Sequence, residues 1–254
     1  MEIYQAIILG LVEGLTEFLP VSSTFHLIFA SQLMQLESSD FLKFFEVFIQ
    51  AGAILAVLFL YGKELLVNRR LQIALILSFI PTAVVGFLLH SVIKNVFFEN
   101  NILMLSAFFL LGVIFIFFEK LHQSKTNNLD QLQWWQALLV GTAQALAVIP
   151  GVSRSGAVIL CMLLLGHNRA TAAKYSFLLA LPTICSAAAL DLWKMQGQIG
   201  FARGEVTVLI IGSITAFIAS LVILRWFINF LSKHSLAAFG YYRLIFGSLL
   251  LALL

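Results

Sequence analysis

The stretch "VEGLTEFLPVSSTFH", from Val12 to His26, decides the fold because it places charged and hydroxyl residues inside an apolar region. Its flanks read "YQAIILGL" on one side and "LIFASQLM" on the other. Glu13 and Glu17 are four residues apart, so on a helix they share one face. Ionisable groups in hydrocarbon are costly, and their presence there indicates a functional site.

The composition of the chain is that of an integral membrane protein. Hydrophobic residues make up 61% of its 254 residues and charged residues 11%, whereas an average soluble domain is about 45–50% apolar and about 25% charged. The mean hydropathy is +1.01. The length suits one membrane domain over residues 1–254. The net charge of +3 comes from scattered basic residues, so we expect no nucleic-acid partner.

Two neighbouring pairs of apolar segments are not simple membrane spans, which need about 20 apolar residues each. The pair 3–19 and 21–36 is interrupted at Pro20, and the pair 134–149 and 155–166 is interrupted at Pro150. Irregular backbone occurs at membrane depth only where it is buried in protein or lines a wet cavity. We therefore expect an all-α, polytopic protein with two re-entrant helical hairpins and six transmembrane helices, at 44–61, 71–91, 103–118, 175–193, 206–228 and 238–254.

The basic residues suggest an orientation for this arrangement. If the first hairpin enters from outside and segment 44–61 runs inward, most basic residues fall on the cytoplasmic side, as the positive-inside rule requires. The cytoplasmic set is Lys63, Arg69, Arg70, Lys120, Lys125, Arg169, Lys174, Arg225, Lys233 and Arg243, and the external set is Lys43, Lys94, Lys194 and Arg203. We expect both termini outside and the second hairpin entering from the cytoplasm.

The two interrupted pairs resemble each other. "GLVEGLTEFLPVSST" begins at Gly10 and "GTAQALAVIPGVSRS" begins at Gly141; in each, an acid or amide, Glu13 or Gln144, follows three residues after the glycine. Both continue to a proline and a serine-rich helix start. The sequence therefore predicts two pseudo-repeats, about 1–118 and 119–254, inserted with opposite topology and meeting at broken helices, as in many transporters.

The second elbow, "PGVSRSG" from Pro150 to Gly156, is suited to binding phosphate. Gly151 allows a tight turn and a close backbone approach to a ligand. Ser153 or Ser155 can cap the following helix, whose N-terminal amides form an anion site. Arg154 adds a planar fork that matches phosphate oxygens. The alternative is a capped helix start whose arginine only neutralises a buried glutamate.

The first elbow is suited to a cation and to phosphoryl transfer. Two carboxylates one turn apart in a low dielectric repel each other unless one is protonated or a cation lies between them. Glu13 and Glu17 are therefore candidate ligands for Mg²⁺ or Ca²⁺, whose coordination is completed by phosphate and water; a purely structural pair is the alternative. His26 lies one turn after Ser23 and could reach its hydroxyl. Either side chain could act as nucleophile or base. Ser22 and Thr24 are candidate phosphate ligands or ordinary helix caps.

At these residues the chain resembles the undecaprenyl-diphosphate phosphatase family, also called bacitracin-resistance proteins. "EGLTEFLPVSST" followed by Phe25 and His26 matches one of its signature regions, and "PGVSRSG" matches the other; "FEVFIQAGAILAV" and "SFLLALPT" are also similar. The resemblance covers nearly the whole chain. It implies a bacterial inner-membrane hydrolase, dependent on a divalent cation, that removes the terminal phosphate of a polyprenyl diphosphate at a site open to the periplasm. Its catalytic residues would be Glu13, Glu17, Ser23, Thr24, His26 and Arg154.

Three positions depart from the family pattern. Phe25 stands where the family has glycine, which adds bulk beside His26 and predicts an altered pocket. Val158 replaces a hydroxyl residue, and Lys174 replaces an acid. None of the three is among the residues expected to perform chemistry.

Two rival functions use the same features. A polyprenyl-phosphate flippase or transporter would hold the headgroup at the elbows without cleaving it. A type-2 phosphatidic-acid-phosphatase-like enzyme would need a histidine six residues after the arginine, but position 160 is Leu. The sequence leaves open the attacking atom, the identity of the cation, the oligomeric state, and whether Glu46 and Gln50 contribute oxygens to the site.

Overall fold

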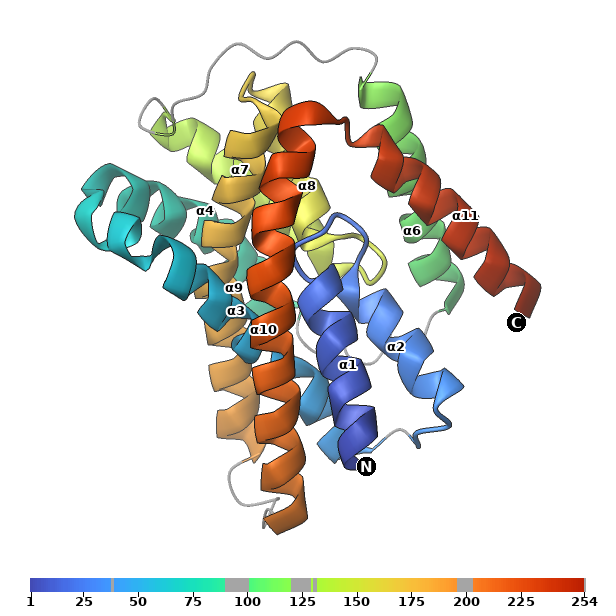
Figure 1. Ribbon diagram of the computed structural model, residues 1–254. Helices are drawn as coiled ribbons and strands as arrows, with labels where there is room; N and C mark the ends of the chain where they lie inside the picture. The colour runs from blue at the N-terminus through green and yellow to red at the C-terminus, as the bar shows by residue number, and fades with distance from the viewer. Residues whose placement is uncertain (38, 90–100, 120–128, 130–131, 196–202, 254) are drawn as a thin grey trace.

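The described part of the chain is helical. The computed structural model describes residues 1–37, 39–89, 101–119, 129, 132–195 and 203–253, and no strand occurs among them. Its helices are α1 (Ile3–Thr16), α2 (Ser23–Leu33), α3 (Asp40–Val67), α4 (Arg69–Leu88), α6 (Asn101–Glu119), α7 (Trp134–Ala145), the 3-10 turn η3 (Leu146–Val148), α8 (Arg154–Leu164), α9 (Arg169–Met195), α10 (Arg203–Lys233) and α11 (Ala237–Leu253), shown in Figure 1. The prediction of an all-α fold is confirmed.

Four of the described helices, α3, α4, α9 and α10, are long and apolar enough to cross a membrane, by length and composition. Helices α6 and α11 are apolar but shorter. Side-chain caps begin two of the long helices. The Ser39 hydroxyl accepts a hydrogen bond from the Leu42 amide at the start of α3, and the Asn68 side chain accepts one from the Leu71 amide at the start of α4. These helices agree with a polytopic membrane protein, while the count of six spans stays a prediction.

The two interrupted pairs form short helical hairpins, α1–α2 and α7–α8. They enter the bundle from opposite ends, and their elbows meet near its middle (Figure 1). Each elbow contains one residue with left-handed backbone, Ser22 at φ 67° and Gly151 at φ 90°. A β-carbon at Gly151 would collide with the carbonyl oxygen of Met104, so this turn needs glycine for space as well as for φ.

Each hairpin packs against a long helix from the other half of the chain. Helix α1 lies along α10, and α7 lies along α4. Small residues make both contacts close: a β-carbon at Gly14 would lie 2.5 Å from the Ala216 carbonyl oxygen, and one at Gly141 would collide with the Ser78 carbonyl oxygen. Small residues at such contacts are typical of helix pairs in membranes. These two contacts between the halves of the chain hold both elbows near the middle of the bundle.

The membrane orientation deduced from the basic residues stays a prediction, and the structure corrects the place of one of them. Lys174 of α9 forms an ion pair of 2.6 Å with Glu64 of α3, so the end of α3 and the start of α9 lie together. Arg243, which was assigned to a cytoplasmic connection, is instead fully buried inside the protein; that assignment is wrong, because the residue belongs to the apolar helix α11 and not to a loop. Three residues of the charge argument lie outside the described residues: Lys94, Lys120 and Lys125. The side chains of Lys194 and Arg203 lie outside them as well.

Candidate active site

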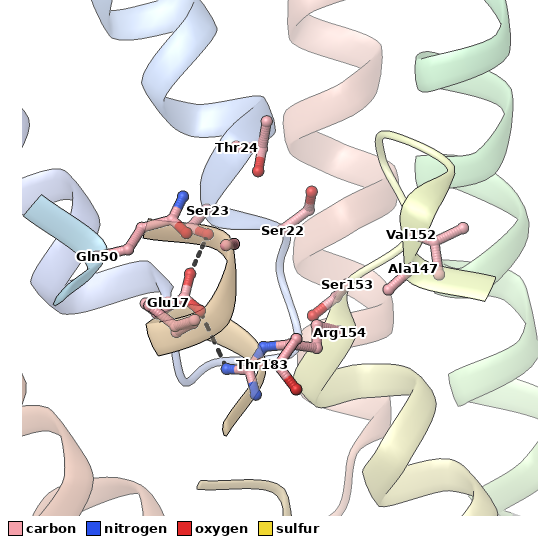
Figure 2. Close-up of a pocket in the computed structure, with 12 residues that line it drawn as sticks. Glu17, Ser22, Ser23, Thr24, Gln50, Ala147, Val152, Ser153, Arg154 and Thr183 are labelled. Atoms are coloured by element: carbon pink, nitrogen blue, oxygen red, sulfur yellow. Dashed lines mark hydrogen bonds and ion pairs between the residues drawn. The ribbon is translucent and has the colours of Figure 1, made fainter. Parts of the chain in front are cut away.

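An ion pair joins the two elbows. Arg154, the first residue of α8, places Nη2 3.0 Å from Oε1 of Glu17, which follows α1. The other oxygen of Glu17 accepts a 2.5 Å hydrogen bond from the hydroxyl of Ser23, the first residue of α2. Figure 2 shows this chain of contacts, Ser23 to Glu17 to Arg154, beside the pocket. A candidate nucleophile, a carboxylate and a guanidinium are thus joined by successive hydrogen bonds.

A cavity of about 170 Å³ opens beside these three residues. Both elbows line it together with helices α3 and α9, and most of the lining side chains are polar or small (Figure 2). The lining residues are Glu17, Ser22, Ser23, Thr24, Gln50, Ala147, Val152, Ser153, Arg154, Thr183, Ile184 and Ala187. Four of the predicted phosphate ligands, Ser22, Thr24, Ser153 and Arg154, are among them, as is Gln50. The other two, Gly151 and Ser155, are not.

The second elbow supplies the basic side of the cavity. Ser153 caps α8, because its hydroxyl accepts a hydrogen bond of 3.2 Å from the Gly156 amide. Ser155 instead donates to the carbonyl of Leu19 at 2.8 Å and so ties this elbow to the first. The guanidinium of Arg154 also donates to the Ser176 carbonyl at 3.3 Å. A helix N-terminus with a fixed arginine is a site that favours an anion.

Glu13 is the most unusual polar group of the site. It is fully buried one turn before Glu17, and neither of its carboxylate oxygens has a hydrogen-bond partner among the described residues. Its charged neighbours are Glu17, Arg154 and Glu46. A buried carboxylate without partners is costly unless it binds a proton or a cation. Glu13 and Glu17 therefore fit a divalent cation whose remaining ligands come from outside this pair.

No third acidic side chain completes a metal site with Glu13 and Glu17 in the part of the chain that the structure describes. Within the described ranges, no group of three His, Cys, Asp or Glu residues could hold a metal. The oxygen Oε1 of Glu46 accepts a 3.0 Å hydrogen bond from Ser31. Gln50, one turn later on α3, lines the cavity and can offer its amide oxygen. Substrate phosphate and water would complete such a site, as is usual for Mg²⁺.

His26 does not occupy the predicted position. Its Nδ1 lies 2.8 Å from the Ser22 carbonyl and its Nε2 lies 2.7 Å from the hydroxyl of Tyr242 on α11. A carbonyl only accepts, so Nδ1 carries the hydrogen, and Nε2 of the neutral ring accepts from Tyr242. The expected contact with Ser23 is wrong, because that hydroxyl donates to Glu17 and the imidazole faces α11. His26 is also not among the residues that line the cavity.

Phe25 points away from the cavity. Its ring stacks on Phe108 of α6 at a centroid distance of 4.4 Å and meets Phe246 of α11 edge to face at 6.3 Å. The side chain is 6% exposed and belongs to a separate apolar cluster with Met104 and Leu250. Phe25 is not among the residues that line the cavity, and its effect on the shape of the pocket stays a prediction. The ring instead joins α2 to α6 and α11.

Sequence reasoning missed two residues at this site. Thr183 lines the cavity and accepts a 3.1 Å hydrogen bond from Nε2 of Gln144, which also donates to Thr82 at 2.8 Å. Tyr242 holds His26 but lies 216 residues later in the chain. The position of Thr183 within "SFLLALPT" could have identified it, whereas no local pattern distinguishes Tyr242 from its neighbour Tyr241.

Comparisons with known proteins match nearly the whole chain. The sequence model of the family described as "Bacitracin resistance protein BacA" matches residues 6–249. Proteins named undecaprenyl-diphosphatase are similar along nearly their whole length. The one from Aquifex aeolicus is 43% identical over 246 residues, covering 96% of this chain and 95% of the relative. The one from Persephonella marina is 44% identical over 256 residues, covering 99% and 98%. The one from Thermus thermophilus is 42% identical over 245 residues, covering 95% and 93%.

Proposed function

The chain belongs to the family of the bacitracin resistance protein BacA, and from this premise we infer that it is an undecaprenyl-diphosphatase. It hydrolyses undecaprenyl diphosphate to undecaprenyl phosphate and inorganic phosphate, which recycles the lipid carrier used in cell-wall synthesis. The observation that carries this function is the line of contacts Ser23–Glu17–Arg154 at one cavity. It supports a mechanism in which a nucleophile, a base and a cationic group act on one phosphoryl group.

We propose that the diphosphate headgroup binds between the two elbows. Arg154 and the amides at the start of α8 attract the terminal phosphate, because both present positive charge to the cavity. Ser22, Thr24 and Ser153 offer further hydroxyl and backbone groups along the same wall. The apolar lining residues Val152, Ile184 and Ala187 suit the first atoms of the polyprenyl chain. The lipid tail then remains in the surrounding membrane.

Ser23 is the proposed nucleophile. Its hydroxyl already donates to Glu17, so Glu17 takes the proton as Ser23 Oγ bonds to the terminal phosphorus and undecaprenyl phosphate leaves. Water then attacks the phosphoserine. Glu17 returns its proton to Ser23 Oγ and takes one from the water, which releases phosphate; Glu17 then passes that proton to the departing phosphate or to solvent, which restores its carboxylate. Arg154 stabilises the charge that develops on the phosphoryl oxygens in both steps.

His26 has a different role in this proposal. Both ring nitrogens are already bonded, one to the Ser22 carbonyl and the other to Tyr242. We therefore assign His26 to positioning the first elbow, and the choice between serine and histidine as nucleophile falls on Ser23. The left-handed backbone of Ser22 is the conformation that this contact holds.

Glu13 and Glu17 would hold a divalent cation, Mg²⁺ or Ca²⁺, and a bound cation would neutralise charge on the diphosphate oxygens and orient them. The support is the pair of unpartnered, buried oxygens on Glu13. The hard oxygen donors of a carboxylate favour these two ions over softer metals. The cation dependence of the reaction is the direct test of this part of the proposal.

For the membrane arrangement, we propose six transmembrane helices and two re-entrant hairpins in an inverted repeat, in the bacterial inner membrane with the site open to the periplasm. The opposite entry of the two hairpins supports it (Figure 1). So does the exchange of partners, α1 with α10 and α7 with α4. Surrounding membrane lipids are the expected partners, besides the lipid substrate.

The test is phosphate release from undecaprenyl diphosphate by purified protein in detergent, with and without a chelator. The proposal predicts release that stops when the chelator is added and resumes when Mg²⁺ or Ca²⁺ is restored. Tight binding of the substrate without release would instead favour a transporter or flippase that uses the same headgroup site. If the chelator does not change phosphate release, the reaction needs no divalent cation. The protein would then still be a phosphatase, and only the proposed cation site would be wrong.

A further inference from the structure

Arg243 of α11 holds both elbows at once. Its Nη1 donates to the Pro20 carbonyl of the first elbow at 3.2 Å, and its Nη2 donates to the Gly151 carbonyl of the second at 2.5 Å. Its Nε donates to the Phe108 carbonyl of α6 at 2.9 Å. The guanidinium lies 4.1 Å from the centroid of the Phe108 ring. One side chain therefore joins two elbows that are about 130 residues apart in the sequence.

The carbonyl oxygens of Pro20 and Gly151 are stabilised by their hydrogen bonds to Arg243. Pro20 and Gly151 lie in turns between short helices, so their carbonyl oxygens do not have the regular partners that a continuous helix provides. Both residues are buried, and an unpaired carbonyl inside a membrane protein costs free energy. The five hydrogens of a guanidinium point in fixed directions in one plane, which lets it serve several oxygens together.

We propose that Arg243 is a positioning residue of the phosphatase, a role that rests on the proposed function. Arg243 does not line the cavity. It sets the distance between the elbow that carries Ser23 and the elbow that carries Arg154. Two further contacts, Ser155 with Leu19 and Arg154 with Glu17, cross between the same elbows, and Arg243 supports them from the side of α11.

The expected effect of losing Arg243 is on turnover more than on substrate binding. A displacement of about 1 Å in reacting groups can lower a rate about 10²-fold. Because attraction of an anion by Arg154 and the start of α8 depends on distance less steeply than the alignment of reacting atoms does, KM should change far less than kcat. An arginine that acted only through its positive charge would behave differently, since charge at a distance would affect binding of the anionic substrate most.

Three variants test the proposal on undecaprenyl diphosphate in detergent. Arg243→Gln removes the charge and most donors, and Arg243→Lys keeps the charge but cannot reproduce the planar fork. Arg225→Gln, on the exposed part of α10, is the matched control. The kcat, the KM and the thermal unfolding midpoint are measured for each. We expect both Arg243 variants to lose about 10²-fold in kcat, with a smaller change in KM, and the control to match the wild type.

Each outcome decides between this inference and its alternatives. A wild-type kcat in folded Arg243→Gln would overturn it, and so would an Arg243→Lys variant with wild-type kcat, because charge alone would then suffice. If Arg243→Gln does not fold, Arg243→Lys decides; if neither folds, Arg243 serves folding and the proposal is wrong. An inactive wild type would instead defeat the proposed function.

Discussion

The two elbows share a backbone plan and differ in charge. Each follows a short helix, contains a proline, has one residue in left-handed backbone, and starts a second short helix with a serine-rich turn. The first carries Glu13 and Glu17 and the second carries Arg154. Of these, Glu17 and Arg154 line the same cavity, so an acidic and a basic version of one turn face each other there. A duplicated scaffold supplies the geometry, and a few side chains supply the chemistry.

The comparison is sharpest at Glu13 and Gln144, which occupy corresponding places in the two halves. Both are buried. The amide nitrogen of Gln144 donates to Thr82 and Thr183, and so holds α7 to α4 and α9. Neither oxygen of Glu13 has such a partner within the described part of the chain. The amide nitrogen of Gln144 is therefore bound within the protein, whereas its oxygen Oε1, like both oxygens of Glu13, has no hydrogen-bond partner among the described residues.

The largest effect is expected for Ser23→Ala in the first elbow. Loss of the attacking oxygen should lower kcat at least about 10⁴-fold, as for other nucleophiles that act together with a base. His26→Gln, one turn later, should retain far more activity because His26 does not line the cavity. The initial rate of phosphate release measures both. An active Ser23→Ala beside an inactive His26→Gln would reverse the assignment.

The next largest effect is expected for Arg154→Ala in the second elbow. Loss of the guanidinium removes both the phosphate ligand and the partner of Glu17, and should lower kcat about 10³-fold. Arg154→Lys should recover only part of the rate, because an ammonium cannot bind phosphate and Glu17 in the same fork geometry. Circular dichroism and detergent melting show whether each variant is folded. Turnover near the wild-type rate in Arg154→Ala would contradict the assigned role.

Glu13→Gln makes the first elbow resemble the second and should have a smaller effect. The variant removes one proposed cation ligand but keeps the size of the side chain. We expect the concentration of Mg²⁺ or Ca²⁺ needed for half-maximal activity to rise about 10–100-fold, the range in which altered metal environments change affinity. The reverse exchange, Gln144→Glu, is the control and should leave that concentration unchanged. An unaltered cation requirement in Glu13→Gln would place the ion elsewhere.

The smallest effect on turnover is expected for Phe25→Gly. Phe25 packs against Phe108 and Phe246 and not into the cavity, so the rate per folded molecule should stay equal to the parent or exceed it. Stability should fall by about 3–5 kcal/mol, as when a buried phenylalanine is removed. Thermal unfolding and phosphate release are compared on the same sample. An inactive but folded variant would show that the ring is needed to shape the elbow.

The sequence was sufficient for the parts of the site that depend on local pattern. The short apolar segments, the prolines and the glycines predicted two elbows, and their likeness as an inverted repeat predicted that the elbows of Glu17 and Arg154 would meet. The ion pair of 3.0 Å shows that they do. The helix cap at Ser153 follows equally from residue type and spacing.

The parts that the sequence did not predict depend on helices distant in the chain. His26 turns toward Tyr242 and Phe25 toward Phe108 because α11 and α6 pack beside the first elbow, and spacing within α2 contains no information on that neighbour. Arg243 is a different case. It lies inside the apolar segment 238–254, where a charge indicates a buried role, whereas the positive-inside rule counts every basic residue as part of a connection.

The central claim is that the acidic and basic elbows act as one site. A double-mutant cycle in kcat for phosphate release, with Glu17→Gln, Arg154→Gln and the double variant, tests it most directly. If the residues act as one unit, the double variant should be about as active as the weaker single variant. If the two losses multiply, the elbows contribute independently and the claim is wrong.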